Sequence, residues 1–206
     1  MKTPRCSKVS SLKIAALLAL ALAPLGGRAA DEFKPEAGFT SLFNGRDLTG
    51  WCYREGDKAD AKVAAAFDGK AASDDERYSA KDGVLTVHPH TPRKVQKIFT
   101  QEVFPKNFVL RLEFRAEVNA DSGIFLRAPQ LQCRDYLVAG PYKQLKAYKP
   151  QDWNSIEVTV KDGVARCTCN GEVLEEALKL PASGPIGLEG DRGQMEYRRI
   201  RIQELP

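Results

Sequence analysis

The sequence predicts an all-β protein, in which antiparallel strands pack as a sandwich around one core. In the segment FVLRLEFRAEV, at 108–118, apolar and polar residues alternate, which is the period of a strand with one buried face. The segments WNSIEVTV, at 153–160, and MEYRRIRIQEL, at 195–205, alternate in the same way. The pattern places these side chains in the core: Phe108, Leu110, Leu112, Phe114, Ile156, Val158 and Val160.

Tight turns separate the predicted strands. The phrase KDGV occurs at 81–84 and again at 161–164, and each Asp-Gly pair suits the positive φ angles of a two-residue hairpin turn. Asn170 and Gly171 form a third pair of this kind. Regular turns between alternating segments favour an antiparallel arrangement.

Two stretches interrupt the strand pattern. Residues 54–77 are charged and rich in alanine, which predicts a long surface insertion with one or two helical turns. Residues 137–152 predict a second loop. Long loops often line a site and are as often plain surface, so both alternatives stay open.

The N-terminal segment has the layout of a secretory signal peptide. Basic residues precede the apolar run at 14–22 and small residues follow it, which predicts cleavage near Ala29 and a mature domain at 30–206. A membrane-spanning helix needs about 20 apolar residues, and this run is much shorter. The protein is therefore expected to be secreted or periplasmic, with no membrane segment after cleavage.

Removal of this segment changes the charge. Residues 1–29 hold five basic residues and no acidic ones, so 31 basic and 27 acidic residues become 26 and 27. A nearly neutral chain lacks the electrostatic footprint of a nucleic-acid-binding protein. The remaining length suits one domain, and the oligomeric state stays open.

The predicted mature domain has four cysteines, an even number that favours disulfides in an oxidising compartment. Cys167 and Cys169 point the same way from one predicted strand, so each is expected to pair with Cys52 or Cys133. The alternative is a zinc site built from the four thiolates, although the usual C-x-x-C spacing is missing.

Polar side chains gather in the segment DSGIFLRAPQLQCRD, at 121–135. Alternation puts Gln130 and Gln132 on the face opposite to Leu131. Amide groups held on rigid strands suit the fixed hydroxyl directions of a sugar. The alternative is an ordinary solvated sheet face.

Histidines and aromatic residues offer further candidates. His88 and His90 are the chain's two histidines, and they either share a metal ion or belong to plain surface. Trp51, Trp153 and Tyr136 are candidate stacking platforms for sugar rings, with burial in the core as the alternative for the two tryptophans.

Several phrases, taken in order, resemble one family. They include GFTSLFNGRDLTGW at 38–51, DSGIFLRA at 121–128 and GPIGLEGDRGQMEYRRIRIQEL at 184–205. With the strands between them, they make the chain similar to the 3-keto-disaccharide hydrolase domain. The resemblance implies a concanavalin-like jelly roll of two curved antiparallel sheets, with a carbohydrate or glycoside ligand on the concave face.

The resemblance also implies a chemistry. A 3-ketone makes the hydrogen on carbon 2 of a sugar acidic, so a base there can drive loss of the carbon-1 substituent. Positive charge must stabilise the enolate oxygen. No cofactor is certain, and a divalent metal (calcium, magnesium or zinc) is one source of that charge.

The chain departs from the family pattern at three places, one of which is Asp121, where the family has an asparagine before Ser-Gly. Gln130 stands where the family has a glutamate, and Leu188 is followed by Glu189, Gly190 and Asp191 where a histidine is expected. The acidic residues in these segments remain candidates for a base or a metal site. On the resemblance, the catalytic set is Arg127, Asp135 and Glu189, and the substrate-binding set is Gln130, Gln132, Asp121, Asp191 and Tyr136.

Three functions are compatible with these patterns. The first is an enzyme that cleaves 3-keto-glycosides by elimination and hydration. The second is a non-catalytic, lectin-like sugar-binding module with the same fold. The third, ranked last, is a structural exported protein without a ligand.

Overall fold

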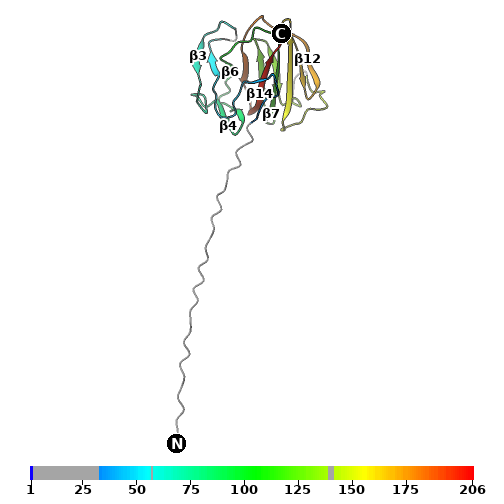
Figure 1. Ribbon diagram of the computed structural model, residues 1–206. Coiled ribbons are helices and arrows are strands. Elements are labelled where there is room, and N and C mark those ends of the chain that lie inside the picture. The colour runs from blue at the N-terminus through cyan, green and yellow to red at the C-terminus, as the bar shows by residue number, and fades with distance from the viewer. Residues whose placement is uncertain (2–32, 57, 139–141) are drawn as a thin grey trace.

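The computed structural model describes Met1 and residues 33–56, 58–138 and 142–206. These ranges contain fourteen strands in two antiparallel sheets and no helix (Figure 1). The predicted all-β jelly roll is therefore confirmed. Apart from Met1, the predicted signal peptide lies outside the described residues, and no described segment forms a helix that is long and apolar enough to cross a membrane.

The larger sheet, here called sheet A, contains eight strands. β14, red in Figure 1, lies in its middle, between β7 and β5, and also pairs with the short β1. In sheet order the strands are β12 (Glu172–Lys179), β11 (Val164–Cys169), β10 (Asn154–Lys161), β7 (Phe108–Ala116), β14 (Met195–Glu204), β5 (Val84–Val87) and β4 (Tyr78–Lys81), with β1 (Thr40–Ser41) on β14.

The smaller sheet, sheet B, contains six strands. In sheet order they are β3 (Val63–Ala66), β2 (Trp51–Arg54), β6 (Gln96–Thr100), β13 (Ile186–Gly190), β8 (Asp121–Leu126) and β9 (Gln130–Arg134). The segments that resemble the family, at 121–128 and 184–205, thus become neighbouring strands of sheet B and the central strand of sheet A.

The core between the sheets contains the predicted side chains. All seven are at most 1% exposed, because each alternating strand turns its apolar face inward. The predicted turns are confirmed as well. Asp82 and Gly83 have φ angles of 50° and 81°, and the other two pairs, Asp162-Gly163 and Asn170-Gly171, are also positive at both residues.

The expected helical insertion at 54–77 is wrong for its described residues. Instead of helical turns, this stretch contributes strand β3 to the edge of sheet B. Phe67, directly after β3, is fully buried and anchors the segment in the core. The expected loop at 137–152 has no strand or helix in its described residues.

The expected disulfides do not form, since all four cysteines are free, buried thiols. Cys52 packs with Phe99 in a small cluster apart from the main core, whereas the other three cysteines lie in that core. Cys52 therefore lies on the opposite side of sheet B from any partner in the core. Burial also raises the pKa of the Cys133 thiol well above its usual value.

Candidate functional site

The outer face of sheet B, turned away from the core, carries most of the predicted site residues. One row of cross-strand partners runs across it, from Cys52 through Phe99, Gly187 and Phe125 to Gln130. The residues that alternate with this row, such as Ile98, Ile124 and Leu188, belong to the core on the other side. A second row pairs Lys97 with Glu189 and Gly123 with Gln132, and a third pairs Asp121 with Arg134.

Glu189 is the central carboxyl group of this face. It is 9% exposed, and its Oε2 accepts a hydrogen bond of 2.7 Å from Gln130 Nε2. Burial raises the pKa of Glu189, and the negative charges of Asp191 and Asp121 raise it further, against the opposing effects of Lys97 and the Gln130 bond. A carboxyl group in this state can take up and return a proton.

The contact between Gln130 and Glu189 depends on a glycine. Gln130 lies on β9 and Glu189 on β13, and β8 runs between these two strands. A Cβ atom at Gly123 of β8 would lie only 2.0 Å from Gln130 Nε2. The Gln130 side chain therefore crosses β8 through the space that Gly123 leaves open.

Asp121 is tied to its neighbours on the same face. Its Oδ1 accepts a 2.7 Å hydrogen bond from Gln132 Nε2, and its Oδ2 lies 3.3 Å from Arg134 Nη2 and 3.7 Å from Arg192 Nη2. Arg134 is 8% exposed, and its buried Nε has no hydrogen-bond partner among the described residues. One nitrogen of this guanidinium therefore lacks an acceptor in the described part of the protein, while another is paired with Asp121.

Asp191 is paired with a residue from a distant segment. Arg93 Nη2 donates a 2.6 Å hydrogen bond to Asp191 Oδ2, and Arg93 Nε donates to Oδ1. The Asp191 side chain is 10% exposed and that of Arg93 is 62% exposed. Arg93 and Asp191 thus form a bidentate ion pair next to the end of β13.

An apolar patch adjoins the polar groups. The rings of Phe99 and Phe125 meet edge to face, with centroids 6.5 Å apart. Lys97 Nζ lies 3.9 Å from the centroid of the Phe125 ring. The face thus combines a carboxyl group, amides, cations and an apolar surface, as a sugar with polar edges and apolar CH faces would need.

The structure brings five predicted site residues together on this face, from strands β13, β8 and β9 and the residues beside them. They are Glu189, Gln130, Gln132, Asp121 and Asp191. The other three predicted site residues lie elsewhere.

Arg127, expected on the ligand-facing side, lies elsewhere. It follows β8 with a φ angle of 58°, so the strand alternation stops before it. Its guanidinium donates to the carbonyl oxygens of Pro181 and Lys106 and lies 5.3 Å from the Phe108 ring centroid. Burial lowers the pKa of Arg127, and the side chain braces loops at one end of the sandwich.

Asp135, expected as a proton-transfer group, is also apart from Glu189. It follows β9 directly and points to the side opposite Arg134. Its carboxylate accepts hydrogen bonds from the Asn119 backbone N–H at 3.0 Å and from Tyr148 Oη at 3.2 Å. Asp135 is 3% exposed and holds two loops together.

The aromatic and histidine candidates take structural positions. Tyr136, expected to bind substrate, is 1% exposed and donates to the Gln132 carbonyl within the core, so no ring face is open to a ligand. Trp51 is fully buried, in agreement with the core alternative, whereas Trp153 is only half-buried and lies outside the core. His88 and His90 make hydrogen bonds with Ser79 and the Pro92 carbonyl respectively, and among the described residues neither belongs to a group of three or more potential metal ligands.

The face does not fit a divalent metal. Within the described residues, no group of three or more His, Cys, Asp or Glu side chains is placed to hold one. The negative charges of Asp121 and Asp191 act on Glu189, and both carboxylates are already paired with arginines. Arginine side chains therefore already neutralise the two carboxylates that a bound cation would need.

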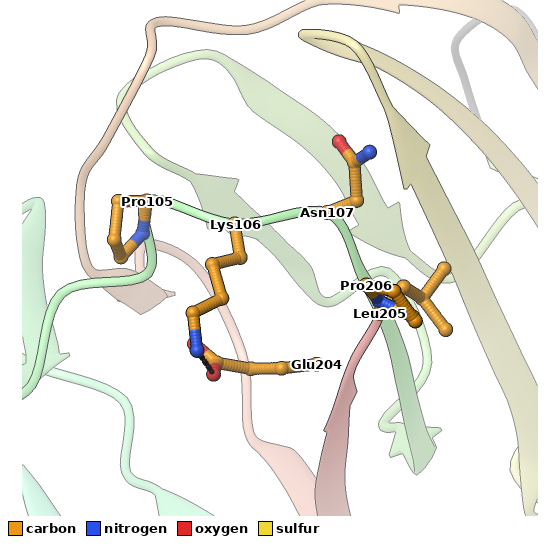
Figure 2. Close-up of a pocket in the computed structure, with 6 residues that line it drawn as sticks. All are labelled: Pro105, Lys106, Asn107, Glu204, Leu205 and Pro206. Carbon is orange, nitrogen blue, oxygen red and sulfur yellow. Dashed lines mark hydrogen bonds and ion pairs between the residues drawn. The ribbon is translucent and has the colours of Figure 1, made fainter.

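A separate hollow of about 690 Å³ lies near the chain's C-terminal end. It is lined by 105–107 and 204–206, and Figure 2 shows Lys106 reaching toward Glu204, with an ion pair of 2.8 Å. Arg127 braces it through the Lys106 carbonyl. The hollow contains none of the residues of the sheet B face, and we do not place the chemistry there.

The cations of this face, Arg134, Arg192, Lys97 and Arg93, were not among the residues predicted from the sequence. Arg134 continues the alternation of Gln130 and Gln132, so its position followed from the pattern even though its role did not. Lys97 and Arg93 lie far from the other site residues in the sequence. Only the pairing of β6 with β13 brings Lys97 beside Glu189.

Comparison with known proteins agrees with this fold. The chain matches the 3-keto-alpha-glucoside-1,2-lyase-like domain over residues 38–203, which is most of its length, and therefore belongs to that family, as the resemblance predicted. Membership makes it a carbohydrate-active protein. No curated protein sequence matches the chain.

Two solved structures share the sandwich, both candidate glycosyl hydrolases from Parabacteroides distasonis ATCC 8503. The first is 18% identical, with a TM-score of 0.58, and the match covers 82% of this chain and 94% of the other. The second is 20% identical, with a TM-score of 0.52, over 65% of this chain and 92% of the other. At these identities the likeness concerns the fold.

Proposed function

We propose that this protein is an exported enzyme that cleaves 3-keto-glycosides on the outer face of sheet B. The observation that carries the proposal is Glu189, a buried carboxyl group with a raised pKa, held by Gln130 beside Lys97. Family membership supports the substrate class. The predicted signal peptide supports export.

In the proposed reaction, the Glu189 carboxylate takes the proton from carbon 2 of the 3-keto sugar. The electron pair of that C–H bond moves into the enolate, whose negative charge develops on the carbon-3 oxygen. The side chains of Lys97 and Arg134 are the nearby sources of positive charge for this oxygen. Gln130 keeps the base oriented.

The second half of the reaction breaks the glycosidic bond. The enolate pair returns to form the carbon-1 to carbon-2 double bond, and the carbon-1 oxygen substituent leaves with its bonding pair and takes up a proton. Water then adds hydroxide to carbon 1 and a proton to carbon 2, which gives net hydrolysis. In this proposal Gln132 and Asp121, which are hydrogen-bonded to each other, bind the sugar hydroxyls.

A chromogenic 3-keto-glucoside tests this proposal directly. We expect release of the chromophore by the purified protein, and a primary isotope effect when carbon 2 carries deuterium, because that C–H bond breaks. Addition of a chelator should leave the rate unchanged. No release above the buffer rate, or the same rate with Glu189→Gln, would refute the proposal.

The second candidate is a sugar-binding module without catalysis. Asp121 and Asp191 are paired with arginines, so Glu189 is the one candidate base among the carboxylates of the described face. A face with a single candidate base favours binding without catalysis. Saturable binding of the same 3-keto-glucoside without turnover would support this candidate.

A further inference from the structure

A buried arginine lies directly beneath the Glu189 face. Arg77 is 2% exposed, and its Nη2 donates to the carbonyl oxygens of Lys94 at 3.1 Å and Asp191 at 3.2 Å. Its Nη1 donates to the carbonyl oxygen of His88. One guanidinium therefore joins both ends of the 88–94 segment to the end of β13.

The backbone leaves room for this guanidinium. A Cβ atom at Gly190 would lie 2.6 Å from Arg77 Nε and 2.8 Å from Arg77 Nη2. Gly190 stands between Glu189 and Asp191, so Arg77 contacts β13 at the point where the acidic pair is presented. A planar fork with several donors suits carbonyl groups from different segments, and a lysine would not span them equally.

The segment that Arg77 holds carries Arg93. Because Lys94 is fixed through its carbonyl, the preceding Arg93 is held where its guanidinium meets the Asp191 carboxylate in two hydrogen bonds. Asp191 lies two residues after Glu189, and its charge acts on Glu189. Neutralisation of Asp191 thus lowers the negative charge beside the proposed base.

We propose that Arg77 and Arg93 are positioning residues for Glu189: Arg77 clamps the 88–94 segment, and the clamp places Arg93 where it neutralises Asp191. The inference rests on the proposed function only for its kinetic consequence. Its electrostatic consequence concerns Glu189 alone and can be measured without a substrate.

Several other charged groups face or affect Glu189, and the test must hold them constant. They are Lys97 from β6, Asp121 from β8, the two arginines that contact Asp121 (Arg134 from β9 and Arg192 after β13), and Tyr78 from the core side. None of these residues is changed in the test variants.

The first experiment follows the Glu189 carboxyl by ¹³C NMR through a pH titration, with the resonance assigned by its loss in Glu189→Gln. In Arg93→Ala, the unpaired Asp191 should move the midpoint up by roughly 0.5 to 1 pH unit. Arg93→Lys should recover part of the shift. Arg93→Ala combined with Asp191→Asn should titrate at or below the wild-type midpoint.

Arg166→Ala is the matched control. Arg166 is also a half-exposed arginine with a carboxylate partner, Glu176 at 3.4 Å, but it lies on sheet A. This variant should titrate like the wild type. An unchanged midpoint in Arg93→Ala, or equal shifts in Arg93→Ala and Arg166→Ala, would overturn the inference.

The role of Arg77 is tested with Arg77→Lys, which keeps the positive charge but removes the guanidinium that contacts three carbonyl groups. We expect an upward shift like that of Arg93→Ala, and no further shift when both changes are combined, because both act through Asp191. If Arg77→Lys does not fold, Gly190→Ala, which presses on the same guanidinium, replaces it. Additive shifts would overturn the clamp.

The kinetic arm separates this inference from the proposed function. With a 3-keto-glucoside, the acidic limb of the kcat profile should move with the NMR midpoint, and the rate below that limb should fall by about three- to tenfold in Arg93→Ala. If the midpoints shift but the wild type shows no turnover, the proposed function fails and the positioning role stands. If turnover is present and the midpoints do not move, the reverse holds.

Discussion

Carboxyl groups on the outer faces of the two sheets have different partners and pKa values shifted in opposite directions. On the sheet A side, arginines pair with Glu36, Glu113 and Glu157, whose side chains are 49%, 17% and 46% exposed. The hydrogen bonds from Arg201 lower the pKa of Glu36 to about 2. On sheet B, Glu189 is buried, its hydrogen bond comes from an amide, and its pKa is raised.

This difference separates surface ion pairs from a group suited to proton transfer. A guanidinium that contacts an exposed carboxylate keeps it ionised, and such a pair contributes little beyond surface order. An amide orients a carboxyl group without supplying a full charge, so burial dominates and the proton affinity rises. The two faces therefore differ in the partner of each carboxyl group as well as in its exposure.

Among the variants that test this difference between the two faces, Glu189→Gln is expected to have the largest effect. Turnover of a 3-keto-glucoside should fall by about 100-fold or more, the size typical of losing a general base, with little change in thermal stability. Glu113→Gln on sheet A is the matched control and should stay within about twofold of the wild type. Equal losses in both variants would mean that the active face has been misassigned.

Gly123→Ala tests the amide partner alone. The added methyl group would press on the Gln130 side chain and move its amide away from Glu189. The acidic limb of the pH–rate profile should then move up, with a rate loss of about threefold at acidic pH. Gly187→Ala is the control, since its added methyl group would meet the Phe99 ring, and it should lower stability without moving the acidic limb. An acidic limb in Gly123→Ala that is identical to that of the wild type would contradict the role of the amide.

The pH dependence of unfolding should have opposite signs for the two carboxyl groups. Glu36 has a folded pKa of about 2 against a usual value of 4.5, so its contribution is present above 4.5 and is lost as the pH falls toward 2. Glu189 has a raised folded pKa, so its contribution is present at low pH and is lost as the pH rises through that folded pKa.

Urea unfolding of Glu36→Gln and Glu189→Gln across this range measures the two contributions. Relative to the wild type, Glu36→Gln should be less stable at neutral pH and closer to it in acid. The free energy of unfolding of Glu189→Gln, relative to that of the wild type, should be higher at neutral pH than in acid. The same sign for both variants would contradict the comparison.

The smallest effect is expected from Trp153→Leu on sheet A. Its ring lies 3.9 Å from the Arg198 guanidinium and 4.8 Å from that of Arg115, so the change removes two cation–π contacts. Chemical denaturation should show a loss of about 1 kcal/mol, and turnover should stay unchanged. A clear loss of turnover would show that the two faces are coupled.

Alternation in the sequence predicted the fold well, because an antiparallel strand with one buried face repeats every two residues. It identified the core from Phe108 to Phe114 and put Gln130 and Gln132 on one outer face. It failed at Arg127, where a positive φ angle ends the repeat.

The cations of the site could not be found from local patterns. Lys97 meets Glu189 only through the register of β6 on β13, and Arg93 meets Asp191 across 98 positions of the chain. Asp135 was misplaced for a related reason, since its partners lie in loops whose positions the sequence alone does not fix.

The register between β8 and β9 has a consequence for sequence change. Phe125 pairs with Gln130 and Ile124 with Leu131, so the hairpin at 127–129 sets which residues of β9 face outward. A slip of one residue would turn Leu131 and Cys133 to solvent and send Gln130 and Gln132 into the core. Mispaired copies would then lose the amide row and the hydrophobic packing together, so a chain that has folded well enough to stay soluble already carries a correctly assembled face.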